Sequence, residues 1–199
     1  IYPDGSEHTA VLAFDGSGMQ VDRYDKVHLV PFGEYVPWRE RLGWIEQIAL
    51  IPVDRVPGPR PRVLRIDGLP PFGAPICFEN AFPEVPRSMV RDGAQFLVLT
   101  INNASYGFSA ASREHLLMSR VLAMETGRWV VHAAISGITA VIDPSGNTVA
   151  TRGLFDPGIT RATIAASTRL TPAVRIGDAA AWVALLVVAL AVARRPSRR

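Results

Sequence analysis

PICFENAFPEVPRSMVRDGAQFLVLTI, residues 75–101, contains the pattern that decides the fold. Residues 75–78 read as a short strand. Pro83 suits the first turn of a helix, which we expect over residues 84–91. The apolar run at 95–101 is typical of a buried strand. A strand, a helix and a buried strand in this order indicate a layered α/β architecture.

Strands and helices continue to alternate on both sides of this stretch. Residues 9–14 and 19–24 flank Asp15-Gly16-Ser17-Gly18, a good hairpin turn. A helix is expected over 109–126, and its apolar positions form one stripe. That stripe consists of Leu117, Val121 and Met124. Further expected elements are a short helix within 38–50 and strands at 63–66, 129–134, 138–142 and 148–150.

Composition excludes several classes of protein. The chain has 199 residues, of which 48% are hydrophobic, so it is too apolar to be disordered and long enough for one sandwich-sized domain. A single Cys excludes an internal disulfide framework and a Cys-rich zinc site. The formal charge of +3 is too weak to indicate nucleic-acid binding, and we expect no nucleic-acid partner.

The C-terminal end has a strong apolar signal. Residues 179–193 read AAAWVALLVVALAVA, without a charge, and RRPSRR follows at 194–199. A run that is apolar on every side and ends in clustered Arg favours a transmembrane helix over a buried core helix. The positive-inside rule would then place the basic tail in the cytoplasm and the preceding residues outside.

Cys77 is the first candidate for chemistry. It lies at the end of an expected strand, just before a helix, and such turns can expose a nucleophile and direct backbone N–H groups at an oxyanion. The alternative is a structural core thiol, which is the commoner role of an isolated Cys beside apolar residues. Glu79 follows two residues later.

Lys26 is the second candidate, in a segment rich in apolar residues, Pro and Gly. Its charge could stabilise a thiolate and an oxyanion. The alternative is a solvated surface Lys paired with Asp25 or Asp22. Glu34 could orient Lys26 or simply cap a loop.

Other polar residues carry weaker signals. Asn102 and Asn103 follow the buried strand at its C-terminal end, where α/β proteins often form sites. The four His residues are scattered without metal-ligand spacing, so neither a metal nor another cofactor is expected.

Five blocks carry a resemblance to a known family. They are YDKVHLVPFGEYVP (24–37), PICFENAFPEVPR (75–87), NNASYGFS (102–109), HLLMSRVLAMETGR (115–128) and SGITAVIDPSG (136–146). In this order they resemble the nitrilase-type domain of the apolipoprotein N-acyltransferase family, within the carbon–nitrogen hydrolase superfamily. The terminal apolar helix after TPAVRIGD matches that family's arrangement as well.

The resemblance implies a domain plan. Residues 1–167 would form an N-terminally incomplete α-β-β-α sandwich and 168–178 a linker. Residues 179–193 would form one transmembrane helix and 194–199 a basic cytoplasmic tail. The catalytic domain would lie on the extracytoplasmic face of a bacterial inner membrane, and the protein would act as a monomer.

The resemblance also implies a reaction. Cys77 would be the nucleophile of a Glu-Lys-Cys triad and Lys26 its Lys, with Glu34 and Glu79 supporting the site. A fatty acyl chain would pass from membrane phospholipid to Cys77 as a thioester. It would then pass to the N-terminal amino group of a diacylglyceryl-modified apolipoprotein. Lys26 and the N–H of Phe78 would hold the oxyanion in both steps, and Asn103 would belong to a nearby loop.

Two departures from the family pattern bear on these expectations. The family's general-base Glu and its bundle of transmembrane helices would lie before the stretch that matches residues 9–14, so we expect the chain alone to be inactive. The block often written NDAWFG reads NNASYG at 102–107, which could alter lipid or acceptor preference.

Two other functions stay open at this point. One is a membrane-tethered nitrilase-type amidase, which would use Cys77 and Lys26 to hydrolyse a small amide. The other is a non-catalytic membrane-anchored module. A long-chain thioester on Cys77 would distinguish the N-acyltransferase from both of these alternatives.

Overall fold

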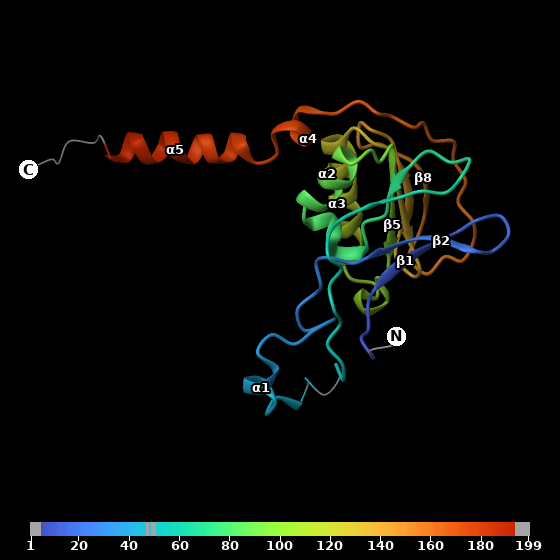
Figure 1. Cartoon of the computed structure of the whole chain (residues 1–199), viewed down its shortest axis with the longest axis horizontal. Coiled ribbons are helices and arrows are strands. Elements are labelled where there is room, and N and C mark those ends of the chain that lie inside the picture. The colour runs from blue at the N-terminus through green and yellow to red at the C-terminus, as the bar shows by residue number, and fades with distance from the viewer. Residues whose placement is uncertain (1–4, 47, 49–50, 194–199) are drawn as a thin grey trace, which may run out of the picture.

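The computed structural model describes residues 5–46, 48 and 51–193. Its centre is a six-stranded sheet in the order β3-β4-β5-β6-β7-β8 (Figure 1). The strands are Val63–Leu64, Phe72–Gly73, Phe96–Ile101, Val130–Ala134, Thr139–Ile142 and Thr148–Arg152. β4, β5 and β6 run parallel, and the outer pairs are antiparallel. The expected layered α/β architecture is confirmed.

Helices α2 (Glu84–Arg91) and α3 (Ala111–Thr126) form the layer beside this sheet. Leu97, Leu99 and Ile101 alternate along β5 and are buried. They belong to the same core as Val85 and Met89 of α2, which are fully buried. The period of two in the strand and the spacing of four in the helix therefore place apolar side chains in one core.

The predicted hairpin is confirmed as β1 (Ala10–Phe14) and β2 (Gln20–Asp25), which pair antiparallel in a separate two-stranded sheet. Asp15 Oδ1 accepts hydrogen bonds from the N–H groups of Ser17 and Met19 and closes the turn. Gly18 has φ +82°, a conformation that suits a residue without Cβ. Lys26 follows β2 directly. The short helix α1 (Arg39–Leu42) lies farther along the chain, within a lobe below the sheet (Figure 1).

The strand predicted over residues 75–78 is wrong. Ile76 makes one isolated parallel bridge with Thr100 of β5. A 3-10 helix, η2 (Cys77–Ala81), begins at the next residue. Cys77 has φ +50°, in the left-handed region, and that conformation cannot continue an extended strand.

The apolar stripe of α3 (Ala111–Thr126) is not its buried face. Its apolar stripe of Leu117, Val121 and Met124 is about half exposed on the outer side. The buried face of this helix instead carries polar side chains, among them His115 and Ser119. The buried face of α3 therefore combines polar side chains with Leu122 and Ala123, which belong to the apolar core.

After the sheet the chain returns along the body to α4 (Pro172–Ile176). Thr171 caps this helix by accepting a hydrogen bond from the Val174 N–H, and Val174 is fully buried. Arg87 of α2, which is nearly buried, forms ion pairs with Glu125 of α3 and with Asp178. These contacts bind residues 168–178 to the helix layer.

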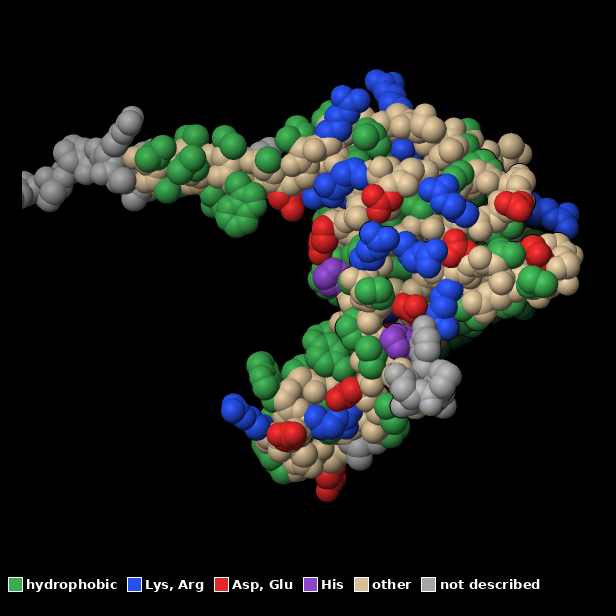
Figure 2. All heavy atoms as spheres, viewed as in Figure 1, with side chains coloured by type: hydrophobic (Ala, Val, Ile, Leu, Met, Phe, Trp, Pro, Cys, Tyr) green, Lys and Arg blue, Asp and Glu red, His purple; other side chains and the backbone are tan. Residues whose placement is uncertain are grey.

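The C-terminal helix α5 (Ala179–Ala193) extends away from the body (Figure 1). Apolar side chains cover it on the face seen in Figure 2, and Trp182 is 69% exposed. Its 15 residues span about 22 Å, whereas a bilayer's hydrocarbon core is about 30 Å thick. Within the described residues no helix is both long and apolar enough to cross a membrane. The expected transmembrane helix is corrected to an apolar helix of this length, and the basic tail at 194–199 lies outside the described residues.

Candidate active site

Cys77 occupies a turn with unusual backbone geometry. Its φ of +50° costs about 1–3 kcal/mol for a residue other than Gly, and such strain persists only where the surroundings fix it. Its thiol is partly buried and donates a long hydrogen bond to the carbonyl of Asn102 (Sγ–O 3.9 Å). Phe78 follows at the second position of η2, where the N–H groups of a helix lack acceptors within the helix itself.

Lys26 and Glu34 form a buried ion pair. Lys26 is 2% exposed, and its Nζ lies 2.6 Å from Glu34 Oε2. Glu34 also accepts hydrogen bonds from the Val30 N–H (2.8 Å) and the Thr9 hydroxyl (2.9 Å), and Arg55 lies 3.2 Å away. Burial alone would raise the pKa of Glu34. The bonds from Lys26 and Val30 outweigh burial and hold the pKa below its ordinary value.

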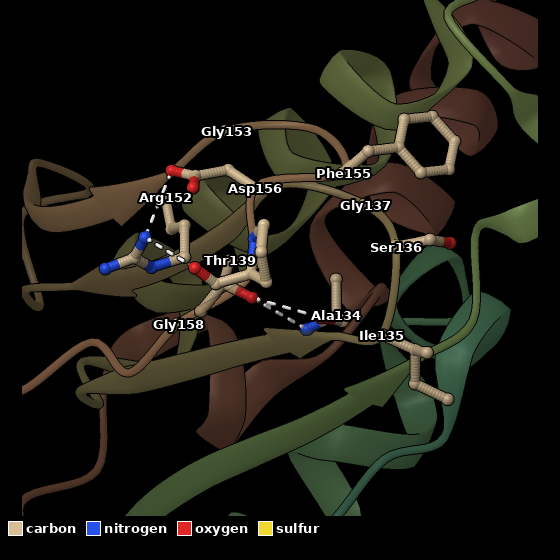
Figure 3. Close-up of a pocket in the computed structure, with 11 residues that line it drawn as sticks. Ala134, Ile135, Ser136, Gly137, Thr139, Arg152, Gly153, Phe155, Asp156 and Gly158 are labelled. Atoms are coloured by element: carbon tan, nitrogen blue, oxygen red, sulfur yellow. Dashed lines mark hydrogen bonds and ion pairs between the residues drawn. The ribbon is translucent and has the colours of Figure 1, made fainter.

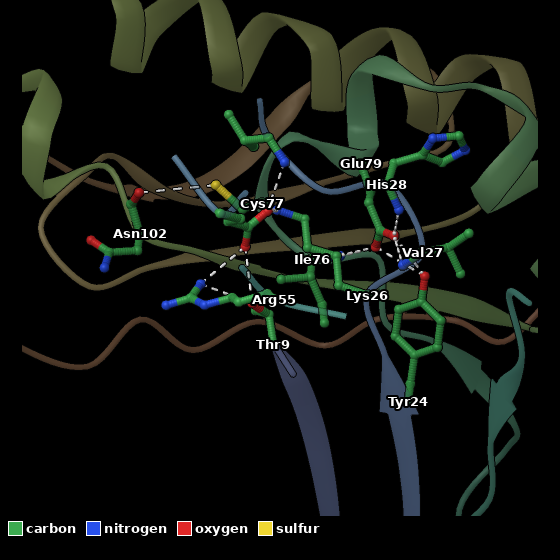
Figure 4. Close-up of polar contacts among 12 residues, drawn as sticks. Thr9, Tyr24, Lys26, Val27, His28, Arg55, Ile76, Cys77, Glu79 and Asn102 are labelled. Atoms are coloured by element: carbon green, nitrogen blue, oxygen red, sulfur yellow. Dashed lines mark hydrogen bonds and ion pairs between the residues drawn. The ribbon is translucent and has the colours of Figure 1, made fainter. Parts of the chain in front are cut away.

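Glu79 joins the Lys26 segment to the turn before Cys77. It is fully buried, and its two oxygens accept bonds from the Tyr24 hydroxyl and from three backbone N–H groups. Those groups belong to Val27 (2.7 Å), His28 (3.1 Å) and Ile76 (2.8 Å) (Figure 4). Burial and the neighbouring Glu79 raise the pKa of Tyr24, so its hydroxyl keeps the proton that it donates. We call Tyr24, Lys26, Glu34 and Glu79 the carboxylate cluster.

A second buried network lies on the other side of Cys77, and we call it the histidine cluster. Its members are Asn80, Asn103, His115, Ser119 and His132, all buried. His115 Nε2 lies 3.1 Å from the Cys77 carbonyl oxygen, and its Nδ1 lies 2.9 Å from Asn103 Oδ1. Ser119 Oγ lies 2.7 Å from His132 Nδ1 and accepts from Asn80 Nδ2 at 2.9 Å.

The two imidazoles of this cluster are held in their neutral form. Burial, with His115 as a second cause, lowers the pKa of His132 to about 3. Burial also lowers the pKa of His115, and the charge of Lys26 adds to this effect. His115 contacts the Cys77 carbonyl, and the charge of Lys26 lowers the pKa of His115. The two clusters therefore meet at Cys77.

The structure brings the expected residues into one region. Lys26 pairs with Glu34. Glu79 accepts from the backbone N–H of the residue after Lys26 and from that of the residue before Cys77. Asn103 reaches Cys77 through His115. Sequence reasoning missed His115, Ser119 and His132. The signal was the spacing of His115 and Ser119, four residues apart on the side of α3 away from its apolar stripe.

A cavity of about 290 Å³ lies at the ends of β6 and β8 (Figure 3). Arg152 reaches across its wall to Asp156 (3.1 Å) and to the carbonyl of Pro157. Gly137, another lining residue, packs so closely on Asn103 that a Cβ would lie 2.8 Å from Nδ2. The cavity therefore borders the histidine cluster. No group of three or more His, Cys, Asp and Glu side chains in the described part of the chain could hold a metal ion.

Known proteins match this chain over most of its length. The carbon–nitrogen hydrolase family model matches residues 3–173. The apolipoprotein N-acyltransferase of Bradyrhizobium diazoefficiens is 40% identical over 95% of this chain and 35% of its own length. The protein of the same name from Synechocystis is 35% identical over 92% and 35%. The chain thus spans about a third of the length of these relatives.

Solved structures share the fold at low sequence identity. A carbon–nitrogen hydrolase from Helicobacter pylori superposes with a TM-score of 0.58 at 18% identity, covering 79% of this chain and 56% of that one. Nit3 of Saccharomyces cerevisiae, a nitrilase-superfamily member, gives 0.56 at 19% identity, covering 87% and 57%. These likenesses confirm the nitrilase-type α/β fold. With the family model matching residues 3–173, the chain belongs to the carbon–nitrogen hydrolase family.

Proposed function

We propose that this chain is the thiol-bearing part of an apolipoprotein N-acyltransferase. The observation that carries the proposal is the buried Lys26–Glu34 pair beside a nucleophile-type turn at Cys77. Two relatives of that name, at 35% and 40% identity over more than nine tenths of the chain, support the choice of substrate class. Both relatives are longer than this chain, so the proposal concerns the full-length protein.

The first half-reaction acylates Cys77. Its sulfur attacks the ester carbonyl of a membrane phospholipid, the S–C bond forms, and the C–O bond to glycerol breaks. The thiol proton passes through a general base to the leaving alkoxide, which departs as a lysophospholipid. Negative charge develops on the carbonyl oxygen, and the Lys26 ammonium and the Phe78 N–H are the groups we assign to stabilise it.

The second half-reaction releases the acyl group. The free amino group of a diacylglyceryl-modified N-terminal Cys attacks the thioester carbonyl, the N–C bond forms, and the S–C bond breaks. The amine proton returns to the thiolate. Because the donor leaves before the acceptor reacts, the kinetics should be ping-pong.

We assign the carboxylate cluster a supporting role in both steps. Glu34 orients Lys26 and balances its charge in a buried site. Glu79 fixes the backbone before Cys77 and after Lys26, so it holds the thiol and the ammonium at a constant separation. Asn103 positions the loop beside the thiol.

Because the proposed donor is a membrane phospholipid, we expect the reaction to take place at a bacterial cell membrane. The exposed apolar surface of α5 agrees with a lipid-facing location for the end of the domain. The extracytoplasmic orientation, the cytoplasmic C-terminus and the monomeric state remain predictions.

The test uses the full-length protein and a phospholipid with an isotopically labelled acyl chain. We expect a long-chain thioester on Cys77, detected by mass spectrometry and removed by hydroxylamine, and no such adduct in Cys77→Ala. Addition of a diacylglyceryl peptide with a free N-terminus should transfer the label to its amine. Ammonia release from small amides without a long-chain adduct would show an amidase instead. If the folded protein carries out neither reaction, it is a non-catalytic module.

A further inference from the structure

The strained backbone at Cys77 raises the question of what fixes it. Glu79 accepts a bond from the N–H of Ile76, before the nucleophile. On the other side, the carbonyl of Cys77 itself faces His115 Nε2 at 3.1 Å. A carbonyl oxygen can only accept, so Nε2 carries the proton and donates it.

The bond to this carbonyl also decides where the next N–H points. The peptide unit between Cys77 and Phe78 is planar and trans, so its C=O and N–H point in opposite directions. A donor that holds the Cys77 oxygen on the interior side therefore directs the Phe78 N–H away from the interior. The proposed function places the oxyanion on that side, next to the thiol.

We propose that His115 is a positioning residue, which holds the Cys77 carbonyl and thereby directs the Phe78 N–H at the oxyanion. This inference rests on the proposed function, because it concerns the step in which a tetrahedral oxyanion forms. His115 acts through the backbone and does not touch the acyl group. Its bond also supplies the constraint that keeps Cys77 in the left-handed region.

Asn103 determines which nitrogen of His115 holds the proton. A neutral ring that donates from Nε2 must accept at Nδ1, the atom that lies beside the Asn103 amide. As placed, the amide turns Oδ1 toward this nitrogen and leaves Nδ2 without a partner among the described groups. The amide rotated by 180° occupies the same space and donates from Nδ2 to His115 Nδ1. The lowered pKa of His115, caused by burial and by Lys26, agrees with this neutral tautomer.

The experiment compares two reactions of the chain's single Cys in the full-length protein. Acylation by p-nitrophenyl butyrate, followed as a burst of p-nitrophenolate, passes through an oxyanion. Alkylation by iodoacetamide does not. For His115→Leu we expect acylation to fall about 100-fold, the effect of losing one oxyanion donor, while alkylation stays within about threefold of wild type. His115→Gln, whose amide can donate from the position of Nε2, should recover acylation to within about tenfold of wild type.

A matched control removes a buried hydroxyl from the same helix, outside the histidine cluster. Thr126→Val breaks the bond from the Thr126 hydroxyl to the Leu122 carbonyl and should keep acylation within about threefold of wild type. A loss in this variant as large as that of His115→Leu would show that any damage to α3 suffices, and would overturn the inference.

Further outcomes decide the remaining cases. Acylation of His115→Leu at the wild-type rate overturns the inference, as does an equal loss of acylation and alkylation. If His115→Leu fails to fold, His115→Asn replaces it, since the shorter amide cannot reach the Cys77 carbonyl. Asn and Gln variants with equal acylation rates then overturn the inference. A folded wild type that forms no thioester overturns the proposed function, and this inference with it.

Discussion

The two polar clusters beside Cys77 are built from different chemistry. The carboxylate cluster contains a Lys and two Glu residues, and backbone N–H groups hold its carboxylates: Val30 for Glu34 and Val27 for Glu79. The histidine cluster contains neutral imidazoles, amides and a hydroxyl, and two of its members, His115 and Ser119, lie on one face of α3. Charge stabilises a reacting centre directly, whereas a neutral network serves to fix geometry. Under the proposed function, the site would separate these two tasks spatially.

The largest expected difference follows from removing the cation. Lys26→Met leaves the Glu34 carboxylate buried with only the more distant Arg55 nearby, so we expect a loss of about 3 kcal/mol in unfolding free energy and no acylation of Cys77. Ser119→Ala in the histidine cluster should cost only about 1–2 kcal/mol. Urea denaturation of the purified variants measures both.

The control for this prediction is the double variant Lys26→Met with Glu34→Gln. It removes both charges, so most of the lost stability should return while acylation stays absent. A double variant as unstable as Lys26→Met would contradict the assignment of the loss to an unpaired charge. Equal losses in Lys26→Met and Ser119→Ala would remove the distinction between the clusters.

Two glycines test how rigidly each cluster is packed. A Cβ on Gly58 would lie 2.4 Å from the backbone oxygen of Asp25, next to Lys26, whose carbonyl accepts from the Gly58 N–H. Because backbone must move, Gly58→Ala should cost about 2–3 kcal/mol and slow acylation. Gly137→Ala displaces the Asn103 amide instead and should cost about 1 kcal/mol.

Gly16→Ala is the matched control, since a Cβ there meets nothing within 4 Å. Its melting temperature should equal that of wild type. If Gly137→Ala destabilises the protein more than Gly58→Ala does, the histidine cluster is packed more rigidly than the carboxylate cluster, contrary to this prediction.

The smallest expected difference concerns pH. His132 has a folded-state pKa of about 3 against an ordinary value of 6.5, so the unfolded chain binds more protons between these values. The contribution of neutral His132 to stability is therefore fully present above pH 6.5 and is lost as the pH falls from 6.5 toward 3. Glu34, whose pKa is also lowered, retains its contribution above its ordinary value of 4.5 and loses it below.

The two clusters should therefore lose stability in different pH ranges. His132→Asn should flatten the slope of unfolding free energy between pH 6.5 and 4.5, and Glu34→Gln should flatten it only below 4.5. Urea titrations at several pH values measure these slopes. An unchanged slope in His132→Asn would show that this imidazole does not titrate as described.

Local sequence signals were sufficient for much of the fold. The hairpin was predictable because Asp15 and Gly18 make a turn from neighbouring residues alone. Local context made Cys77 and Lys26 candidates, and the family resemblance gave them roles. The sequence left open whether Lys26 is buried and whether Glu34 orients it. The burial depends on segments far apart in the chain, which no local pattern shows.

Two features that local patterns do not show have a shared physical origin. The turn at Cys77 was read as a strand because its left-handed backbone is imposed from outside, by Glu79 and His115. The inward face of α3 departs from the usual rule that apolar residues mark the buried side of a helix. Hydrogen-bonded polar side chains such as His115 and Ser119 share that side with Leu122 and Ala123, and a sequence pattern does not show such pairing.

The ion pairs of Arg87 have a mechanical consequence. Arg87 connects Asp178, at the base of α5, with Glu125, near the end of α3. A displacement of the base of α5 is therefore coupled through Asp178 to Arg87 of α2 and, through its second ion pair, to Glu125 of α3. Since α3 also carries His115, which contacts the Cys77 carbonyl, this chain of contacts connects the C-terminal helix to the turn at Cys77.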